Sequence, residues 1–188
     1  MAHISSDTPF CALPIAVLTV SDTRTADNDE SGSILQQSLE DAGHRLAARQ
    51  LCRDDIYQVR AIVSQWIAHP DIAAVLVTGG TGFSDRDNTP EALLPLFDKT
   101  VEGFGELFRH FSLESIGTST VQSRALAGLA NRTLICAIPG SPRACALAWD
   151  SIIAPQLDAR HRPCNFVGQI RPEAITACAP RVSTLEAL

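Results

Sequence analysis

The sequence contains three short apolar runs, each of which leads directly into a polar loop. The runs are IAVLTV at 15–20, AAVLVT at 73–78 and TLICAI at 133–138. Their β-branched residues predict strands, and because polar residues do not alternate with the apolar ones, both faces of each strand must be covered. This pattern favours a sheet that carries helices on its two sides.

Amphipathic segments separate the three runs, as parallel strands with crossover helices require. Gly43 is expected to follow the first helix as its C′ residue, Pro70 to end the second, and Thr89 to be the N-cap of another. The stretch HRLAARQLC alternates weakly and predicts a further strand. Apolar residues recur at helical spacing in four segments: 34–42, 56–67, 104–111 and 144–153. The predicted fold class is α/β, a three-layer α/β/α sandwich with a mainly parallel central sheet.

The length of 188 residues suits one domain with a sizeable core. We expect this domain over residues 14–168, a loose N-terminal arm over 1–13 and an irregular C-terminal tail over 169–188. The start MAHISSDTPF does not resemble a signal peptide, and no run approaches the roughly 20 apolar residues of a membrane span. The six cysteines show no C-x-x-C spacing, which indicates reduced thiols. A cytoplasmic protein with no membrane partner is expected.

The net charge of −6 and the sequence pI near 5.3 limit the class of ligand. A nucleic-acid partner would normally require a basic face that neutralises phosphates, so none is expected. An anionic small molecule needs only a few backbone donors and one or two cations. Such a ligand remains compatible with this composition.

The loops that follow the three apolar runs are the candidate functional segments. They span 21–24, 78–87 and 139–143. In open parallel sheets, ligands bind beyond the carboxyl ends of the strands, at the point where the strand order reverses. If the three strands are neighbours, these loops converge on one site.

The loop TGGTG combines Gly79, Gly80 and Gly82 with the hydroxyl groups of Thr78 and Thr81. Glycines let the main chain approach a ligand, and successive N–H groups can form a nest that binds oxyanions. The loop lacks the lysine of a P-loop and the spacing of a dinucleotide fingerprint. A tight strand-to-helix turn with no ligand explains the same pattern equally well.

Asp54 and Asp87 are the candidate acidic groups. A carboxylate beside a phosphate nest would be repelled unless a divalent cation such as Mg²⁺ lay between them. The alternative for Asp54 is a helix N-cap before Ile56, a position that aspartate favours. Four arginines could pair with phosphates or form ordinary surface ion pairs: Arg24, Arg86, Arg124 and Arg143.

Six segments in order resemble the molybdopterin-binding family: LTVSDTR, DESG, LVTGGTGFSDRDNTPEALLPLF, EGFGELFR, GTSTVQSRALAG and LICAIPGSPRA. The resemblance covers roughly residues 13–167. It implies the three-layer fold, assembly as a homotrimer or as a hexamer of two trimers, and a place in molybdenum cofactor synthesis. It also implies binding of molybdopterin through its pterin, dithiolene and terminal phosphate.

The related adenylyltransferases transfer AMP from Mg²⁺-ATP to that phosphate, so the resemblance implies catalytic and Mg²⁺-binding roles for two aspartates. These match Asp54 and Asp87. The chain departs from the pattern at Arg53, where proline is usual in active enzymes. The implied molybdopterin- and phosphate-binding residues are Ser21, Asp22, Thr78, Gly79, Gly80, Thr81, Gly82, Ser123, Arg124, Pro139, Gly140 and Ser141.

Two functions are consistent with these features. The first is a molybdopterin adenylyltransferase that uses ATP or another nucleotide, which the paired aspartates favour. The second is a non-catalytic carrier that holds molybdopterin or a nucleotide and passes it on.

Overall fold

The computed structural model describes residues 3–173 and contains a six-stranded sheet in the order β3-β2-β4-β7-β6-β5. The strands β3, β2, β4 and β7 are parallel, whereas β6 and β5 run antiparallel to their neighbours. The sheet strands are β2 (Pro14–Val20), β3 (Arg45–Cys52), β4 (Ala74–Thr78), β5 (Lys99–Thr100), β6 (Leu126–Ala130) and β7 (Thr133–Ile138). The α/β fold class is confirmed.

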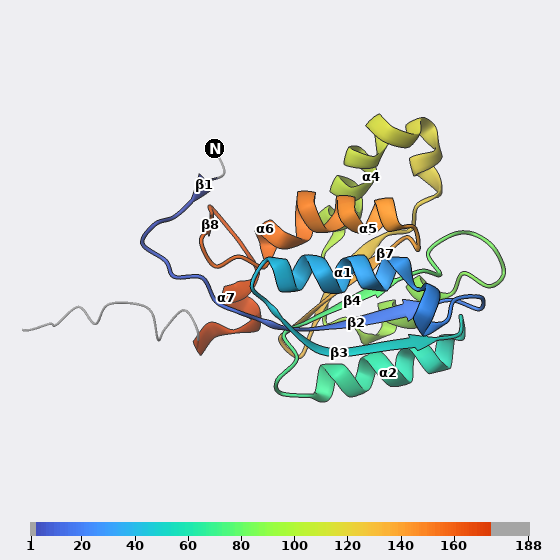
Figure 1. The fold of residues 1–188 in the computed structure, drawn as a ribbon, viewed down its shortest axis with the longest axis horizontal. Helices are drawn as coiled ribbons and strands as arrows, with labels where there is room; N and C mark the ends of the chain where they lie inside the picture. Colours follow the sequence, from blue (N-terminus) through green and yellow to red (C-terminus); the bar gives the residue numbers. More distant parts are fainter. Residues whose placement is uncertain (1–2, 174–188) are drawn as a thin grey trace, which may run out of the picture.

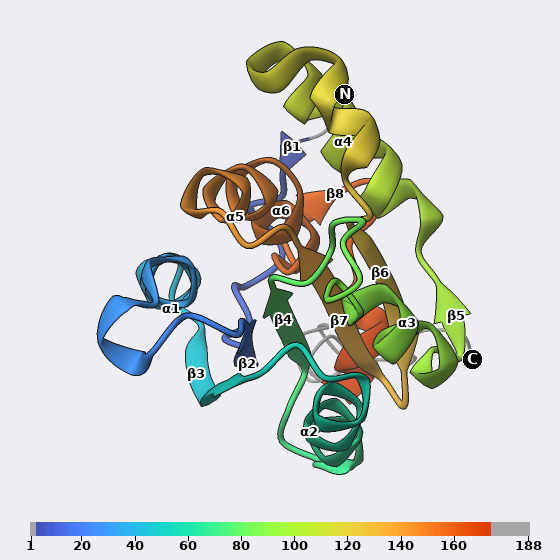
Figure 2. The same ribbon diagram turned by 90° about the vertical axis from the view of Figure 1, so that its right-hand side faces the viewer.

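Helices cover both faces of the sheet and form two separate cores (Figure 1, Figure 2). On one face lie α1 (Glu30–Asp41), α4 (Glu102–Ile116), α5 (Pro142–Ala148) and α6 (Ala154–Gln156). On the other lie α2 (Ile56–Ala68) and α3 (Thr89–Leu93). Because β2, β4 and β7 are buried along nearly their whole length between these layers, their residues are apolar apart from one threonine in each strand.

The central strands end level with one another. Thr19 of β2 pairs with Thr78 of β4, and Thr78 pairs with Ile138 of β7. The chain leaves β2 for β3 on one side and then returns to β4 on the other, so the strand order reverses between β2 and β4. The loops after the three apolar runs therefore emerge side by side at a topological switch point.

Two local expectations differ from the structure. Thr89 is the first residue of α3 rather than its N-cap; Asn88 precedes the helix, and the Thr89 hydroxyl donates to the Gly79 carbonyl at 2.8 Å. Asp55, not Asp54, caps α2, because its carboxylate accepts the backbone N–H groups of the first turn. Asp54 is therefore not used as a helix cap.

The described segments before and after the main sheet also contain regular structure. In β1 (His3–Ile4), the start of the arm pairs with β8 (His161–Arg162), and Leu13 at its end is fully buried. A short helix, α7 (Val167–Ile170), bridges the expected boundary at 168. Most of the expected tail lies outside the described residues. Within the described part of the chain, no helix combines the length and apolar character needed to span a membrane.

Candidate functional site

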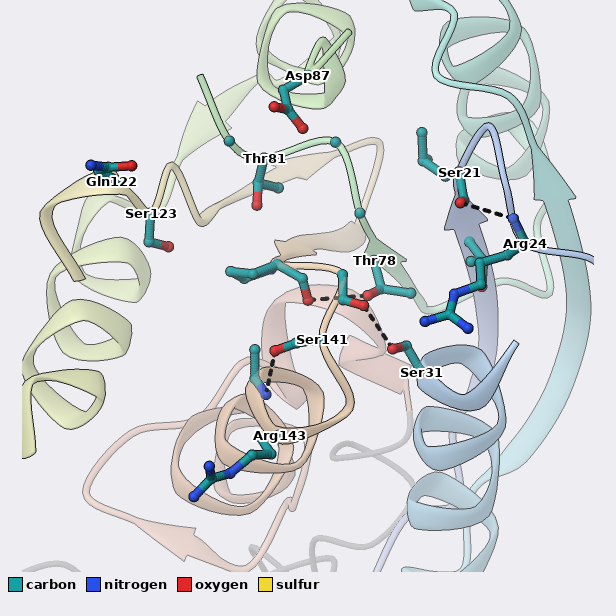
Figure 3. A pocket seen from close by; sticks show the side chains of 18 of the residues that line it. Ser21, Arg24, Ser31, Thr78, Thr81, Asp87, Gln122, Ser123, Ser141 and Arg143 are labelled. Atoms are coloured by element: carbon teal, nitrogen blue, oxygen red, sulfur yellow. Dashed lines mark hydrogen bonds between the residues drawn. The ribbon is translucent and has the colours of Figure 1, made fainter. Parts of the chain in front are cut away.

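A cleft of about 1080 Å³ opens at the carboxyl ends of β2, β4 and β7, where the three loops meet. Figure 3 shows Asp87 and Arg143 at opposite ends of it, with Thr78 between them. Thirteen of the fourteen predicted site residues line the cleft: Ser21, Asp22, Asp54, Thr78, Gly79, Gly80, Thr81, Gly82, Asp87, Ser123, Pro139, Gly140 and Ser141. Arg124 does not.

The glycine turn at the floor of the cleft is held by main-chain contacts. Gly79 and Gly80 both have positive φ, +103° and +63°. The Gly79 N–H donates to the Ile138 carbonyl at 3.0 Å, which ties the turn to the end of β7. A Cβ at Gly80 would stand 2.6 Å from the Asp54 carboxylate, so only glycine permits this approach.

Asp54 reaches the turn from the end of β3 and is buried, with 6% of its surface exposed. Its Oδ1 accepts the Asn88 N–H at 3.2 Å, and its own N–H donates to Asp22 Oδ1 at 3.3 Å. Asp87 lies on the loop after the glycine turn, where its Oδ2 accepts the N–H and the hydroxyl of Ser84 at 2.8 and 2.6 Å. Segments far apart in sequence thus bring three carboxylates to one end of the cleft.

The pKa values of the two candidate catalytic carboxyls, Asp54 and Asp87, are shifted in opposite directions. Burial raises the pKa of Asp54, and the negative charges of Asp87 and Asp22 raise it further, although the Asn88 N–H acts against them. Burial also tends to raise the pKa of Asp87, but hydrogen bonds from Ser84 and Gly82 outweigh it, so that pKa is lowered. Asp87 therefore holds its negative charge more firmly than Asp54.

Two of the four candidate phosphate-binding arginines are committed to the protein itself. Arg86 forms a bidentate ion pair with Asp22, which joins the loops after β2 and β4 and lowers the Asp22 pKa. Arg124 pairs with Glu91. Arg24 and Arg143 line the cleft, and the Arg143 guanidinium has no hydrogen bond or ion pair with residues 3–173. Arg24 and Arg143 are therefore better placed to meet an anion.

The loop after β7 closes the opposite side. The Ser141 hydroxyl accepts the Ala144 N–H at 3.2 Å and caps α5, while the Pro139 carbonyl accepts the Thr78 hydroxyl at 3.2 Å. Ser31, at the start of α1, donates to the Gly140 carbonyl at 2.9 Å. These contacts fix the loop as a wall, as Figure 3 shows.

One wall was not predicted from the sequence. It comes from α4 and the following 3₁₀ helix η3 (Gly117–Gln122), whose side chains Phe108, Ser112, Ser115, Ile116 and Ser119 line the cleft. The spacing of these residues is helical, and two serines on the same helical face as Phe108 and Ile116 were the available signal. This wall adds hydroxyl groups to the cleft.

Residues 16–159 match the family described as "Probable molybdopterin binding domain". The chain belongs to the molybdopterin-binding family. Molybdenum cofactor biosynthesis protein B of Escherichia coli (strain K12) is 57% identical over 166 residues, covering 88% of this chain and 96% of that protein. The protein of the same name from Bacillus subtilis (strain 168) is 44% identical over 142 residues, covering 75% and 84%.

Solved structures of the molybdopterin-binding family share the fold. A crystal structure of molybdenum cofactor biosynthesis protein B has 40% sequence identity and a TM-score of 0.76, covering 78% of this chain and 92% of the other. The tungsten cofactor synthesizing protein MoaB from Pyrococcus furiosus has 31% identity and a TM-score of 0.69, covering 76% and 91%. The resemblance seen in the sequence is confirmed.

Mg²⁺ is the cofactor that the resemblance to adenylyltransferases of the molybdopterin-binding family implies. Residues 3–173 contain no group of three or more His, Cys, Asp or Glu side chains that could hold a metal. Mg²⁺, however, commonly takes one or two protein carboxylates and completes its shell with water and phosphate oxygens. The Asp54 Oδ2 atom accepts no hydrogen bond from the described residues and faces the glycine turn. The Asp54 carboxylate therefore fits an ion that is shared with a phosphate. Binding of Mg²⁺ by Asp54 and Asp87 stays a prediction.

Proposed function

We propose that this protein acts in molybdenum cofactor biosynthesis, where it binds molybdopterin and adenylylates its terminal phosphate with Mg²⁺-ATP. One observation carries the proposal: the cleft brings Asp54 and Asp87 from different segments to the N–H groups of the glycine turn. The relatives named molybdenum cofactor biosynthesis protein B support the pathway. The family match supports molybdopterin as the ligand.

The proposed reaction needs no side-chain nucleophile. An oxygen of the molybdopterin phosphate forms a bond to the α-phosphorus of ATP, the α–β phosphoanhydride bond breaks, and pyrophosphate leaves. The chain's task would be to hold two anionic reactants in line, with turn N–H groups other than that of Gly79, which is bonded to Ile138, and with Arg24 or Arg143. Mg²⁺ bound at Asp54 and Asp87 would supply charge neutralisation between the reactants.

The second candidate is a carrier that binds molybdopterin or a nucleotide without turnover. Two features favour it: burial and neighbouring carboxylates raise the Asp54 pKa, and an exposed arginine, Arg53, stands where proline is usual in the active enzymes. The first means that a proton competes with a cation for Asp54 more than it would for an ordinary aspartate.

The deciding experiment is to incubate the purified protein with molybdopterin and Mg²⁺-ATP and to detect adenylylated molybdopterin and pyrophosphate by mass spectrometry. Asp87→Asn is expected to lower the rate by roughly 100-fold or more, because it removes a charge from the reacting centre. Asp85→Asn is the matched control, since the Asp85 side chain is exposed and makes no hydrogen bond to the described residues.

Product that Asp87→Asn abolishes and Asp85→Asn retains supports catalysis. Saturable binding of molybdopterin without product supports the carrier. A chain that binds neither molybdopterin nor a nucleotide would exclude both functions.

We further propose that the protein works in the cytoplasm as a homotrimer or as a hexamer of two trimers. Exposed apolar side chains on α4 and η3, among them Leu107, Leu113 and Val121, support contact between copies. Light scattering after size-exclusion chromatography tests this: three or six copies are expected, and a monomer at micromolar concentration would exclude both assemblies.

A further inference from the structure

Arg124 lies between η3 and β6, and its side chain enters the loop that follows the glycine turn. Its Nε donates to the Gly82 carbonyl at 2.7 Å, and its Nη2 donates to the Asp87 carbonyl at 2.6 Å. Its Nη1 pairs with the Glu91 carboxylate. The guanidinium carbon lies 5.1 Å from the centre of the Phe83 ring. One side chain therefore contacts four residues between 82 and 91, the last of them, Glu91, in α3.

The Arg124 side chain is not part of the cleft lining. The residues that line the cleft include Gly82, Ser84 and Asp87, but not Arg124. All three of the guanidinium's nitrogens already donate to acceptors within the protein. Because each nitrogen is held by one of these bonds and the side chain does not line the cleft, Arg124 acts on the loop rather than on a ligand.

The bond to the Asp87 carbonyl has a geometric consequence. A trans peptide is planar, so the carbonyl of one residue and the N–H of the next point in opposite directions. With the Asp87 carbonyl held by Arg124, the Asn88 N–H is turned the other way, and there it donates to Asp54 Oδ1 at 3.2 Å. The same peptide thus connects Arg124 to Asp54.

The main chain of Asp87 is fixed by the same bond. Its carboxylate is bound by Ser84 on one side, and its carbonyl is bound by Arg124 on the other. Movement of the 87–88 peptide would therefore displace Asp87 and release Asp54 together. Because the guanidinium is planar and has donors in fixed directions, it can hold the Gly82 and Asp87 carbonyls at once; a lysine ammonium has no such fork.

We propose that Arg124 is a positioning residue that orients Asp54 and Asp87 through the 87–88 peptide, without touching the ligand. This inference rests on the proposed function for its meaning in catalysis, but its geometric part concerns the protein alone. It also replaces the expectation from sequence that Arg124 binds molybdopterin or phosphate directly.

The geometric part is tested without any ligand, by amide hydrogen exchange and by NMR titration of the carboxyl groups. In Arg124→Met and Arg124→Lys, exchange of the Asn88 amide is expected to accelerate on the order of tenfold. The Asp54 pKa is expected to rise further, because the Asn88 N–H that opposes the rise is lost. Two variants are used, so that the measurement is still possible if one of them fails to fold.

Arg60→Gln is the matched control. Arg60 also donates to main-chain carbonyls of α3, those of Glu91 and Ala92, at 2.8 and 3.2 Å. It does not contact the 87–88 peptide. Asn88 exchange and the Asp54 titration are therefore expected to match wild type in Arg60→Gln, even if its thermal stability falls as much as that of the Arg124 variants.

The activity arm uses molybdopterin and Mg²⁺-ATP. Arg124→Lys is expected to lower kcat by roughly 10- to 100-fold while the KM for ATP changes little. Wild-type exchange at Asn88 in Arg124→Met, or full restoration of exchange and titration by lysine, would overturn the positioning role. A wild-type protein that makes no adenylylated product defeats the proposed function but leaves the exchange result decisive for Arg124.

Discussion

Replacing Gly79 with alanine is expected to destabilise the fold strongly, because the turn leaves no room for a methyl group. Gly79 has φ +103°, and a Cβ there would overlap the Val20 carbonyl oxygen and stand 3.1 Å from the Val20 carbonyl carbon. Those atoms belong to the main chain of β2 and cannot rotate away. The Gly79 N–H and carbonyl are both hydrogen-bonded, to Ile138 and Thr89, so the turn cannot move without breaking these bonds.

The magnitude follows from two contributions. A left-handed backbone costs a non-glycine residue about 1–2 kcal/mol. Forcing extra volume against an immobile neighbour costs about 1–3 kcal/mol. The free energy of unfolding should therefore fall by roughly 2–5 kcal/mol, a large part of the roughly 5–15 kcal/mol that stabilises a typical domain.

Gly103→Ala provides the control, since a Cβ at Gly103 meets nothing within 4 Å and the residue lies in α4. It should raise the stability by up to about 1 kcal/mol. Both variants are measured by urea unfolding, followed by far-UV circular dichroism. If Gly79→Ala came within about 1 kcal/mol of wild type with an unchanged m-value, the turn would have absorbed the methyl group, and the argument for a rigid turn would fail.

Three further predictions concern titration and burial. Burial lowers the pKa of His44, whose Nδ1 accepts a backbone N–H, so the folded chain binds fewer protons than the unfolded one. The free energy of unfolding should therefore fall as the pH drops below about 6.5. Urea midpoints measured at pH 7 and pH 5 should differ less for His44→Gln than for the wild type. Asp29→Asn removes the partner of Arg49 and should cost about 1–3 kcal/mol of unfolding free energy at pH 7; no loss would contradict the ion pair's role. Burial, with nearby carboxylates, raises the pKa of the Cys52 thiol to about 11. Iodoacetamide at pH 8 should therefore label the exposed Cys164 before Cys52, as followed by mass spectrometry. Equal labelling rates for these two cysteines would contradict the burial of Cys52.

The parts of the fold that could be predicted depend on local patterns. Continuous apolar runs identified β2, β4 and β7, and the rule that ligands bind beyond the carboxyl ends of parallel strands located the cleft. Asp54 remained ambiguous, because two adjacent aspartates precede α2 and either could cap it. Only the path of the main chain shows that Asp55 is the cap and that Asp54 turns toward the glycine loop.

The parts that were missed depend on contacts between distant segments. The stretch LAGLA of β6 is rich in alanine and glycine, which have low strand propensity, and it becomes a strand because it pairs with β7. The partners of Arg86 and Arg124 lie on other loops, 64 and 33 or more residues away. An arginine that binds a carbonyl and one that binds a phosphate look identical in sequence.

The ion pair between Arg86 and Asp22 makes the connection between the loops after β2 and β4 sensitive to ionic strength. Both side chains are substantially exposed, so dissolved salt weakens their attraction. Ionic strength therefore loosens the tie between the two loops. The mobility of the loop that carries Asp87 should consequently increase with salt, and this dependence should be lost once Arg86 is replaced by a neutral residue.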